Sequence, residues 1–231
     1  MKIEKFVLIS AFRGLVQLFI LAGILAYVFS LENVAVLFLI LGVMAWFSAQ
    51  TASKRLERIP DILEIELFTQ FVTVYFIMGL VITLGILPLQ AEFLIPIGGM
   101  VAGNTMDIGY LVLDRMLTEL KNRQGEIESA LALGGNPRLV LTELNVISNS
   151  MRNAITPNLN RLKALGIVAI PGLMAGMIIG GINPLIAAFY QILIFFLIIF
   201  AGLMAGYISS YLAVGKIFHP VDQRIDISFD E

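Results

Sequence analysis

Residues 184–214 read PLIAAFYQILIFFLIIFAGLMAGYISSYLAV, and no Asp, Glu, Lys or Arg interrupts them. A helix needs about 20 apolar residues to cross the ~30 Å hydrocarbon core of a bilayer, so this stretch predicts a membrane-spanning helix. A transmembrane β-strand would alternate polar and apolar residues, which this stretch does not do. Because only helices and closed barrels satisfy every backbone hydrogen bond in lipid, the sequence predicts an all-α membrane protein.

Five further apolar stretches precede this one, and together they predict a polytopic helical bundle with about six transmembrane helices. The predicted spans are residues 8–29, 34–49, 63–84, 93–113, 165–182 and 184–214. Composition agrees, since 58% of the residues are hydrophobic and 14% are charged, whereas roughly a quarter are charged in soluble domains. We expect one transmembrane domain over residues 1–231, lying in the lipid bilayer as a multi-pass protein of the cell membrane.

Basic residues lie on one side of the predicted spans. Of the fifteen Lys and Arg residues, all except Arg13 fall in the N-terminus, in the second and fourth gaps between spans, or in the C-terminal tail. Cytoplasmic loops carry an excess of Lys and Arg. The pattern therefore predicts that both termini are cytoplasmic, together with the longest polar segment, residues 114–163. Arg13 interrupts the first apolar run, which favours a retained helix over a cleaved signal peptide.

Ionisable groups are rare within the predicted spans. Glu64 and Glu66 begin the third span, where carboxylates suit the positive end of the helix dipole near the headgroups, and no acid, Lys or His is expected at mid-span. Ion-coupled carriers usually need such a group. The chain has no Cys and a single His, His219, beyond the last span. We therefore expect no catalytic site, no metal site, no bound cofactor and no nucleic-acid partner.

A transport path is predicted along polar and small residues of the last three spans. Intramembrane amides are functional candidates, but they also join helices, and both interpretations stay open. A proline within the fifth span is expected to kink it, giving either a gate or an ordinary packing bend. The candidate path residues are Met100, Asn104, Pro171, Gly172, Met174, Gly176, Tyr190 and Gln191.

Glycines recur four residues apart on three of the predicted spans. This spacing lets helix backbones approach closely, either within one subunit or between two copies of the chain. The pairs and triplet are Gly99 and Gly103, then Gly172, Gly176 and Gly180, then Gly202 and Gly206.

Residues 126–135, EIESALALGG, predict a short cytoplasmic helix that ends at two glycines. Such a helix either fits a groove on a partner protein or lies flat on the lipid surface. A helix should restart at Asn136-Pro137, because Asn is a good N-cap and Pro is favoured at the first helical position. The same helix-start pattern recurs at Thr156-Pro157, before the fifth span, and at Asn183-Pro184, before the sixth.

Three motifs resemble those of the FetB-type permeases, an ABC transporter family associated with iron export that includes plant aluminium-tolerance permeases. They are IPIGGMVAGNTM at 95–106, LALGGNPR at 131–138, and LGIVAIPGLMAG at 165–176 with its continuation to Gln191. The resemblance runs in order along nearly the whole chain. Some members carry an additional first helix, and the third motif usually has Met-Met where this chain has Leu173-Met174.

The resemblance implies the permease subunit of an ABC transporter, which is not itself an enzyme. Two copies would pair with two cytosolic ATP-binding subunits, which would bind ATP and Mg and move the fourth and fifth spans. The coupling residues would be Glu126, Glu128, Ala130, Leu133, Gly134, Gly135, Pro137 and Arg138. Iron, another metal and a nucleotide sugar stay open as substrates. The alternative is a stand-alone secondary carrier or channel for a metal ion or small solute, and a non-transporting scaffold is a third possibility.

Overall fold

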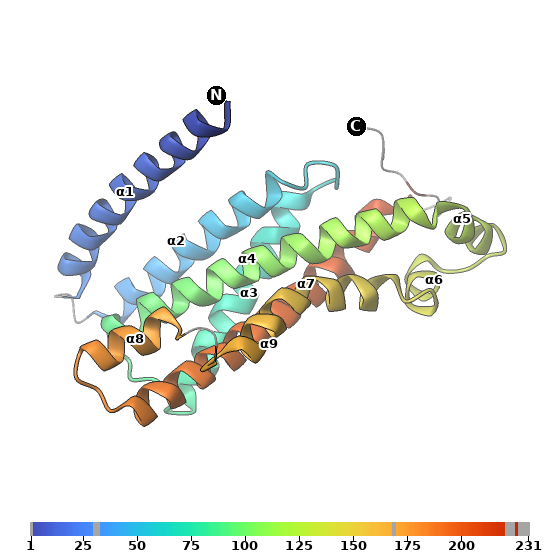
Figure 1. Ribbon diagram of the computed structural model, residues 1–231. Helices are drawn as coiled ribbons and strands as arrows, with labels where there is room; N and C mark the ends of the chain where they lie inside the picture. Colours follow the sequence, from blue (N-terminus) through green and yellow to red (C-terminus); the bar gives the residue numbers. More distant parts are fainter. Residues whose placement is uncertain (1, 30–32, 168–169, 220–224, 226–231) are drawn as a thin grey trace.

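The structure is a computed structural model that describes residues 2–29, 33–167, 170–219 and 225. All regular elements within these ranges are helices (Figure 1), which confirms the all-α prediction. The helices are α1 (Lys2–Val28), α2 (Val34–Ser53), α3 (Ile62–Thr83), α4 (Ala91–Asn122), α5 (Gln124–Ala132), α6 (Pro137–Glu143), α7 (Val146–Ala164), α8 (Gly172–Ile179) and α9 (Pro184–Ile217).

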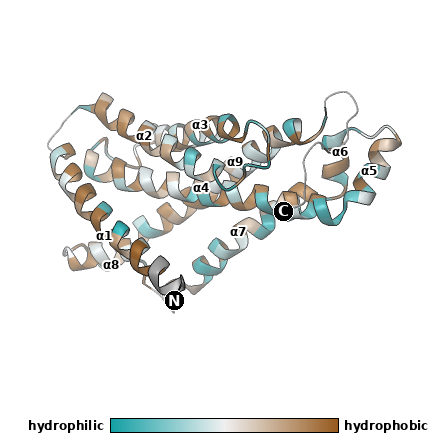
Figure 2. Ribbon diagram, turned by 90° about the horizontal axis from the view of Figure 1, so that it is seen from above, coloured by the Kyte–Doolittle hydropathy of each residue, from teal (hydrophilic) through white to brown (hydrophobic). Residues whose placement is uncertain are grey.

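An elongated bundle of α2, α3, α4, α7 and α9 forms the body of the protein, with α8 at one end and α5 and α6 at the other (Figure 1). Hydrophobic residues run along α1, α2 and α9, and hydrophilic residues gather on α7 (Figure 2). In both views α1 stands off the bundle, and its apolar side chains, among them Phe12 and Phe19, are exposed. A helix of this composition is suited to contact lipid.

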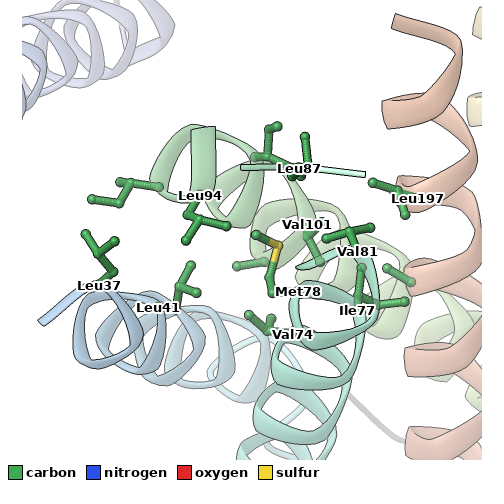
Figure 3. Packing of buried hydrophobic residues seen from close by; sticks show 14 of the residues in the cluster. Leu37, Leu41, Val74, Ile77, Met78, Val81, Leu87, Leu94, Val101 and Leu197 are labelled. Carbon is green, nitrogen blue, oxygen red and sulfur yellow. The ribbon is translucent and has the colours of Figure 1, made fainter. Parts of the chain in front are cut away.

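Two hydrophobic clusters hold the bundle together. In the first, Leu41 of α2, Met78 of α3 and Leu94 of α4 face one another, with Leu197 of α9 beside them (Figure 3). The second cluster, around Met116 of α4, joins the start of α3 and the end of α9 to α5 and α6. The polar segment is therefore packed against the bundle by its own apolar residues.

Four of the described helices are long and apolar enough to cross a membrane: α2, α3, α9, and α1 over Val7–Val28. The fourth predicted span lies within α4, a continuous helix of 32 residues that includes Pro96 and carries charged residues such as Asp107. It is not among these four. The number of six spans therefore stays a prediction, while the several apolar helices of a membrane protein are present.

The predicted fifth span, residues 165–182, is not a long helix in the part that is described. Residues 168–169 fall outside that part, and the helix that follows, α8, has 8 residues. Pro171 is the N-cap of α8, with φ −63° and ψ 147°, so the prediction of a proline kink inside a spanning helix is wrong. The residue before a proline disfavours the α-helical φ and ψ angles, so the boundary of the helix lies at Pro171.

Two of the three predicted Asn-Pro or Thr-Pro helix starts are confirmed. The Asn136 and Asn183 side chains accept hydrogen bonds from the backbone N–H groups at the starts of α6 and α9. Thr156-Pro157 does not start a helix, because Pro157 lies inside α7. The Thr156 hydroxyl instead donates to the carbonyl of Arg152 in the preceding turn. The helix is already established there and continues past the missing N–H of proline.

The glycine pair on α9 packs tightly within this single chain. A Cβ added at Gly202 would collide with the side chain of Ile108 of α4, and one at Gly206 would lie 2.8 Å from Cγ2 of Val112. These glycines let α4 and α9 approach closely. Three other glycines of the predicted faces, Gly103, Gly172 and Gly176, have nothing within 4 Å of an added Cβ.

Candidate functional site

The cytoplasmic coupling segment predicted from the sequence, residues 114–163, forms the end of α4 and the helices α5, α6 and α7. The predicted coupling residues lie on α5, on the start of α6 and on the turn between them. Ile127, which is fully buried, anchors α5 in the second hydrophobic cluster. The exposed carboxylate of Glu126 pairs with Arg123 at 2.7 Å, and that of Glu128 accepts a hydrogen bond of 2.7 Å from Gln124. Arg123 separates α4 from α5, so α5 is a separate short helix.

The turn after α5 leaves Leu133 uncovered, with 90% of its surface exposed. Gly134 has φ +88°, a left-handed conformation that favours glycine, as is common just after a helix. At Gly135 an added Cβ would lie 2.7 Å from Cγ2 of Val140 and 2.8 Å from the carbonyl oxygen of Ala130. Both glycines are therefore needed for the sharp turn that presents Leu133.

Arg138, beside Pro137 in the first turn of α6, connects this segment to the last helix of the bundle. Its guanidinium carbon lies 4.0 Å from the ring centroid of Tyr211 of α9, and its Nη1 donates to the Tyr211 hydroxyl at 2.8 Å. The Tyr211 ring stacks on Tyr207 one turn earlier. A cavity of about 410 Å³ lies beside these residues and is also lined by Asn145 of the α6–α7 turn. Through Arg138, α6 thus contacts α9 directly, a contact that the sequence did not indicate.

The predicted path residues do not gather at one place. On α4, the Asn104 amide donates to the carbonyl of Met100 at 2.9 Å, within its own helix. Asn104 also lines a cavity of about 190 Å³ between α4 and α7, together with Asp107 and the arginines Arg55 and Arg161.

The other path residues lie on α8 and α9. Tyr190 packs against the first hydrophobic cluster, and Gln191 is buried, with an Oε1 atom that has no hydrogen-bond partner among the described residues. Of the predicted residues around α8, Gly172 and Gly176 are exposed, and Pro171 and Met174 are half-buried. No cluster of three or more His, Cys, Asp or Glu side chains occurs in the part of the chain that is described.

A buried polar cluster that the sequence analysis missed lies between α3, α4 and α9. We call it the Glu66 cluster; its members, all with 0% exposure, are Glu66, Thr69, Gln70, Thr105 and Ser209. The Ser209 hydroxyl lies 3.2 Å from Glu66 Oε1 and 3.3 Å from Thr69 Oγ1. The Gln70 amide donates to Glu66 Oε2 at 3.4 Å and accepts from the Thr105 hydroxyl at 2.6 Å.

The burial of Glu66 corrects the expectation that it lies near the headgroups with Glu64. Glu64 is exposed, but Glu66 faces the interior of the bundle. A signal was present in the sequence, since residues separated by three, four and seven positions share a helix face. Thr69, Gln70 and Thr73 follow Glu66 at these spacings and form a polar stripe on an otherwise apolar helix.

A helical chain with several helices apolar enough to cross a bilayer has the features of a multi-pass membrane protein. Residues 1–218 match the model of the uncharacterised protein family UPF0014. The chain belongs to this family.

Relatives come from bacteria and plants. The UPF0014 membrane protein YjkA of Bacillus subtilis is 31% identical over 94% of this chain and 86% of that protein. The Escherichia coli protein named "Probable iron export permease protein FetB" is 30% identical over 96% of this chain and 85% of its own length. Protein ALUMINUM SENSITIVE 3 of Arabidopsis thaliana is 27% identical over 94% and 79%. No solved structure matches the chain. The family resemblance seen in the sequence motifs is confirmed.

Proposed function

We propose that this chain is the membrane-spanning permease subunit of an ABC transporter. Two copies, each with about six spans and cytoplasmic termini, would pair with two cytosolic ATP-binding subunits that bind ATP and Mg. The name of the Escherichia coli relative favours iron export as the activity. The cell membrane would be the location.

The observation that carries this proposal is the exposure of Leu133 on an ordered segment. Leu133 is 90% exposed, although the helix before it is anchored by the buried Ile127 and the turn after it is fixed by two glycines. An apolar side chain held in this way, at the end of a short helix, is suited to a groove on a partner protein. On the same short helix, Glu126 is bonded to Arg123 and Glu128 to Gln124. These groups keep the exposed surface of α5 polar around Leu133.

Coupling would proceed from α6 to α9 and then to α4. When the ATP-binding subunits close, they would displace α5 and α6, and the Arg138–Tyr211 contact would pass that displacement to α9. Because Gly202 and Gly206 hold α9 against α4, a shift of α9 requires α4 to move with it or to repack.

Leu133→Asp is expected to abolish co-purification of the ATP-binding subunit, because a carboxylate would have to be buried in an apolar groove. Leu133→Met, which keeps an apolar side chain of similar size, should leave it intact. Quantitative pull-down from membranes in mild detergent measures the stoichiometry. An ATP-binding subunit that stays bound to the Leu133→Asp chain would show that α5 is not the docking element.

Arg138→Leu is expected to uncouple the transporter rather than dissociate it. The ATP-binding subunit should still co-purify, while transport by reconstituted vesicles falls by about tenfold, within the usual range for a coupling energy between sites. Arg152→Leu, on the exposed surface of α7, is the matched control and should transport normally. Equal transport by the two variants would remove Arg138 from the coupling route.

One observation favours the second candidate, a stand-alone carrier. Glu66 supplies a buried titratable group within an apolar helix, which such a carrier needs. Vesicles that contain only this chain separate the two functions. When an ion gradient is imposed without ATP, a stand-alone carrier transports substrate and a permease subunit does not.

A further inference from the structure

Glu66 is the only acidic or basic side chain among the described residues that is fully buried. Its two carboxyl oxygens contact neutral groups, the amide of Gln70 and the hydroxyl of Ser209. Neither neighbour carries a positive charge. The carboxyl group therefore has hydrogen-bond partners but no ion-pair partner among the described residues.

The helices packed against Glu66 bring no cation to it. α2 contains no ionisable residue. At the start of α3 the nearest charged residues, the N-cap Asp61 and Glu64, are exposed, and Asp107 of α4 is exposed as well. Lys216 of α9 is exposed and forms an ion pair of 2.5 Å with Asp61. The tyrosines and other charged residues of α3, α4 and α9 are exposed or half-buried, outside the cluster.

A carboxylate taken out of water without a compensating charge is strongly unfavourable, so the group needs one positive charge. The oxygen and nitrogen atoms around it contact one another directly, at 2.6–3.4 Å, which are hydrogen-bond distances. A proton fits within these contacts. We propose that Glu66 is a proton-binding site, which holds its proton while α3, α4 and α9 are packed as observed.

The hydrogen bonds of the cluster can accommodate the proton by rotation of one hydroxyl. With the proton bound, Glu66 donates to Ser209 Oγ, and the Ser209 hydroxyl donates to Thr69 Oγ1; the two distances, 3.2 Å and 3.3 Å, suit both bonds. When the proton leaves, Ser209 turns back to donate to the carboxylate, and one negative charge remains in the core. Water must then enter to solvate it, which separates α9 from α3.

Thr73 gives entering water a further polar group. Its hydroxyl is fully buried, has no hydrogen-bond partner among the described residues, and lies one helical turn beyond Gln70 on the same polar stripe. Proton release at Glu66 would therefore open the contact between α3 and α9, and proton uptake would close it. This site does not depend on which of the two transport functions the chain performs.

Infrared spectroscopy of the full-length chain in lipid bilayers tests the proton directly. At neutral pH the wild-type chain should show the carbonyl band of a protonated carboxylic acid, because the exposed carboxyl groups are ionised there. Glu66→Gln should lose the band, and Glu64→Gln, two residues away on the exposed surface, should retain it. Ser209→Ala should keep the band but shift its frequency, which covers the case in which Glu66→Gln does not fold. Absence of the band at neutral pH in the wild type, or its survival in Glu66→Gln, would overturn the proposal.

Thiol labelling tests the opening of the helix contact. The chain has no cysteine, so Thr73→Cys introduces a single reactive site beside the cluster. Its labelling rate, divided by the rate for Thr73→Cys with Glu66→Gln at the same pH, should rise at least tenfold as the pH is raised from neutral to alkaline. A ratio that is independent of pH would contradict the link between proton release and helix separation.

Discussion

Gly202→Ala is expected to destabilise the bundle by about 1–3 kcal/mol, the usual cost of an overpacked core. Alanine is the better helix former, so helix propensity alone predicts a gain in stability. The gain is outweighed because the new Cβ would collide with the side chain of Ile108 at the contact between α4 and α9. Thermal unfolding of the chain in detergent, followed by circular dichroism, measures the change.

Two variants separate the collision from other effects of the substitution. Gly103→Ala places the same methyl group on α4 where nothing lies within 4 Å, and it should be neutral or stabilising. Ile108→Val removes the Cδ1 atom that takes the closest contact, so it should restore part of the stability lost in Gly202→Ala. A Gly202→Ala chain as stable as Gly103→Ala would mean that α4 and α9 are not in close contact.

Gln70→Leu is expected to cost about 3 kcal/mol, at the upper end of the range for a buried partner left without its hydrogen bond. The amide of Gln70 serves two buried groups, the carboxyl of Glu66 and the hydroxyl of Thr105, and leucine can bond to neither. The free energy of unfolding, measured by titration of the purified chain with a denaturing detergent, gives the loss.

The chain contains a matched control on its surface. Gln124 donates to Glu128 four residues later, whereas Gln70 donates to Glu66 four residues earlier, and only the second pair is buried. Because an exposed helix pair contributes at most about 0.5 kcal/mol, Gln124→Leu should have little effect. Similar losses in the two variants would indicate that water reaches the Glu66 cluster and satisfies its groups.

The two corrected helix predictions share a cause. Each proline, Pro171 and Pro157, disfavours the helical conformation of the residue before it. At Pro171 the helix had not begun, so proline marks its start, and at Pro157 the helix was already established, so proline is tolerated inside it. The sequence pattern is the same in both places, and the surrounding packing decides the outcome.

The sequence alone determined the class of the protein and its local signals. Apolar runs set the helical membrane class, Asn136 and Asn183 cap helices beside a proline, and the glycines after Leu133 end α5. Each of these depends on residues near one another in the chain, because helix hydrogen bonds and caps span only a few positions. The sequence motifs also indicated the family, and the match of residues 1–218 to UPF0014 confirms it.

Tertiary structure decided which side chains meet. Ser209 contacts Glu66 across 143 positions of sequence, and Arg138 contacts Tyr211 across 73. Helix periodicity can show that Glu66 and Thr73 share a face, but not whether that face meets lipid, headgroups or another helix. That choice depends on the packing of whole helices, in which glycines at the contact between α4 and α9 fix how closely those two helices approach. For this reason the buried carboxyl group and the route from α6 to α9 emerged only from the folded chain.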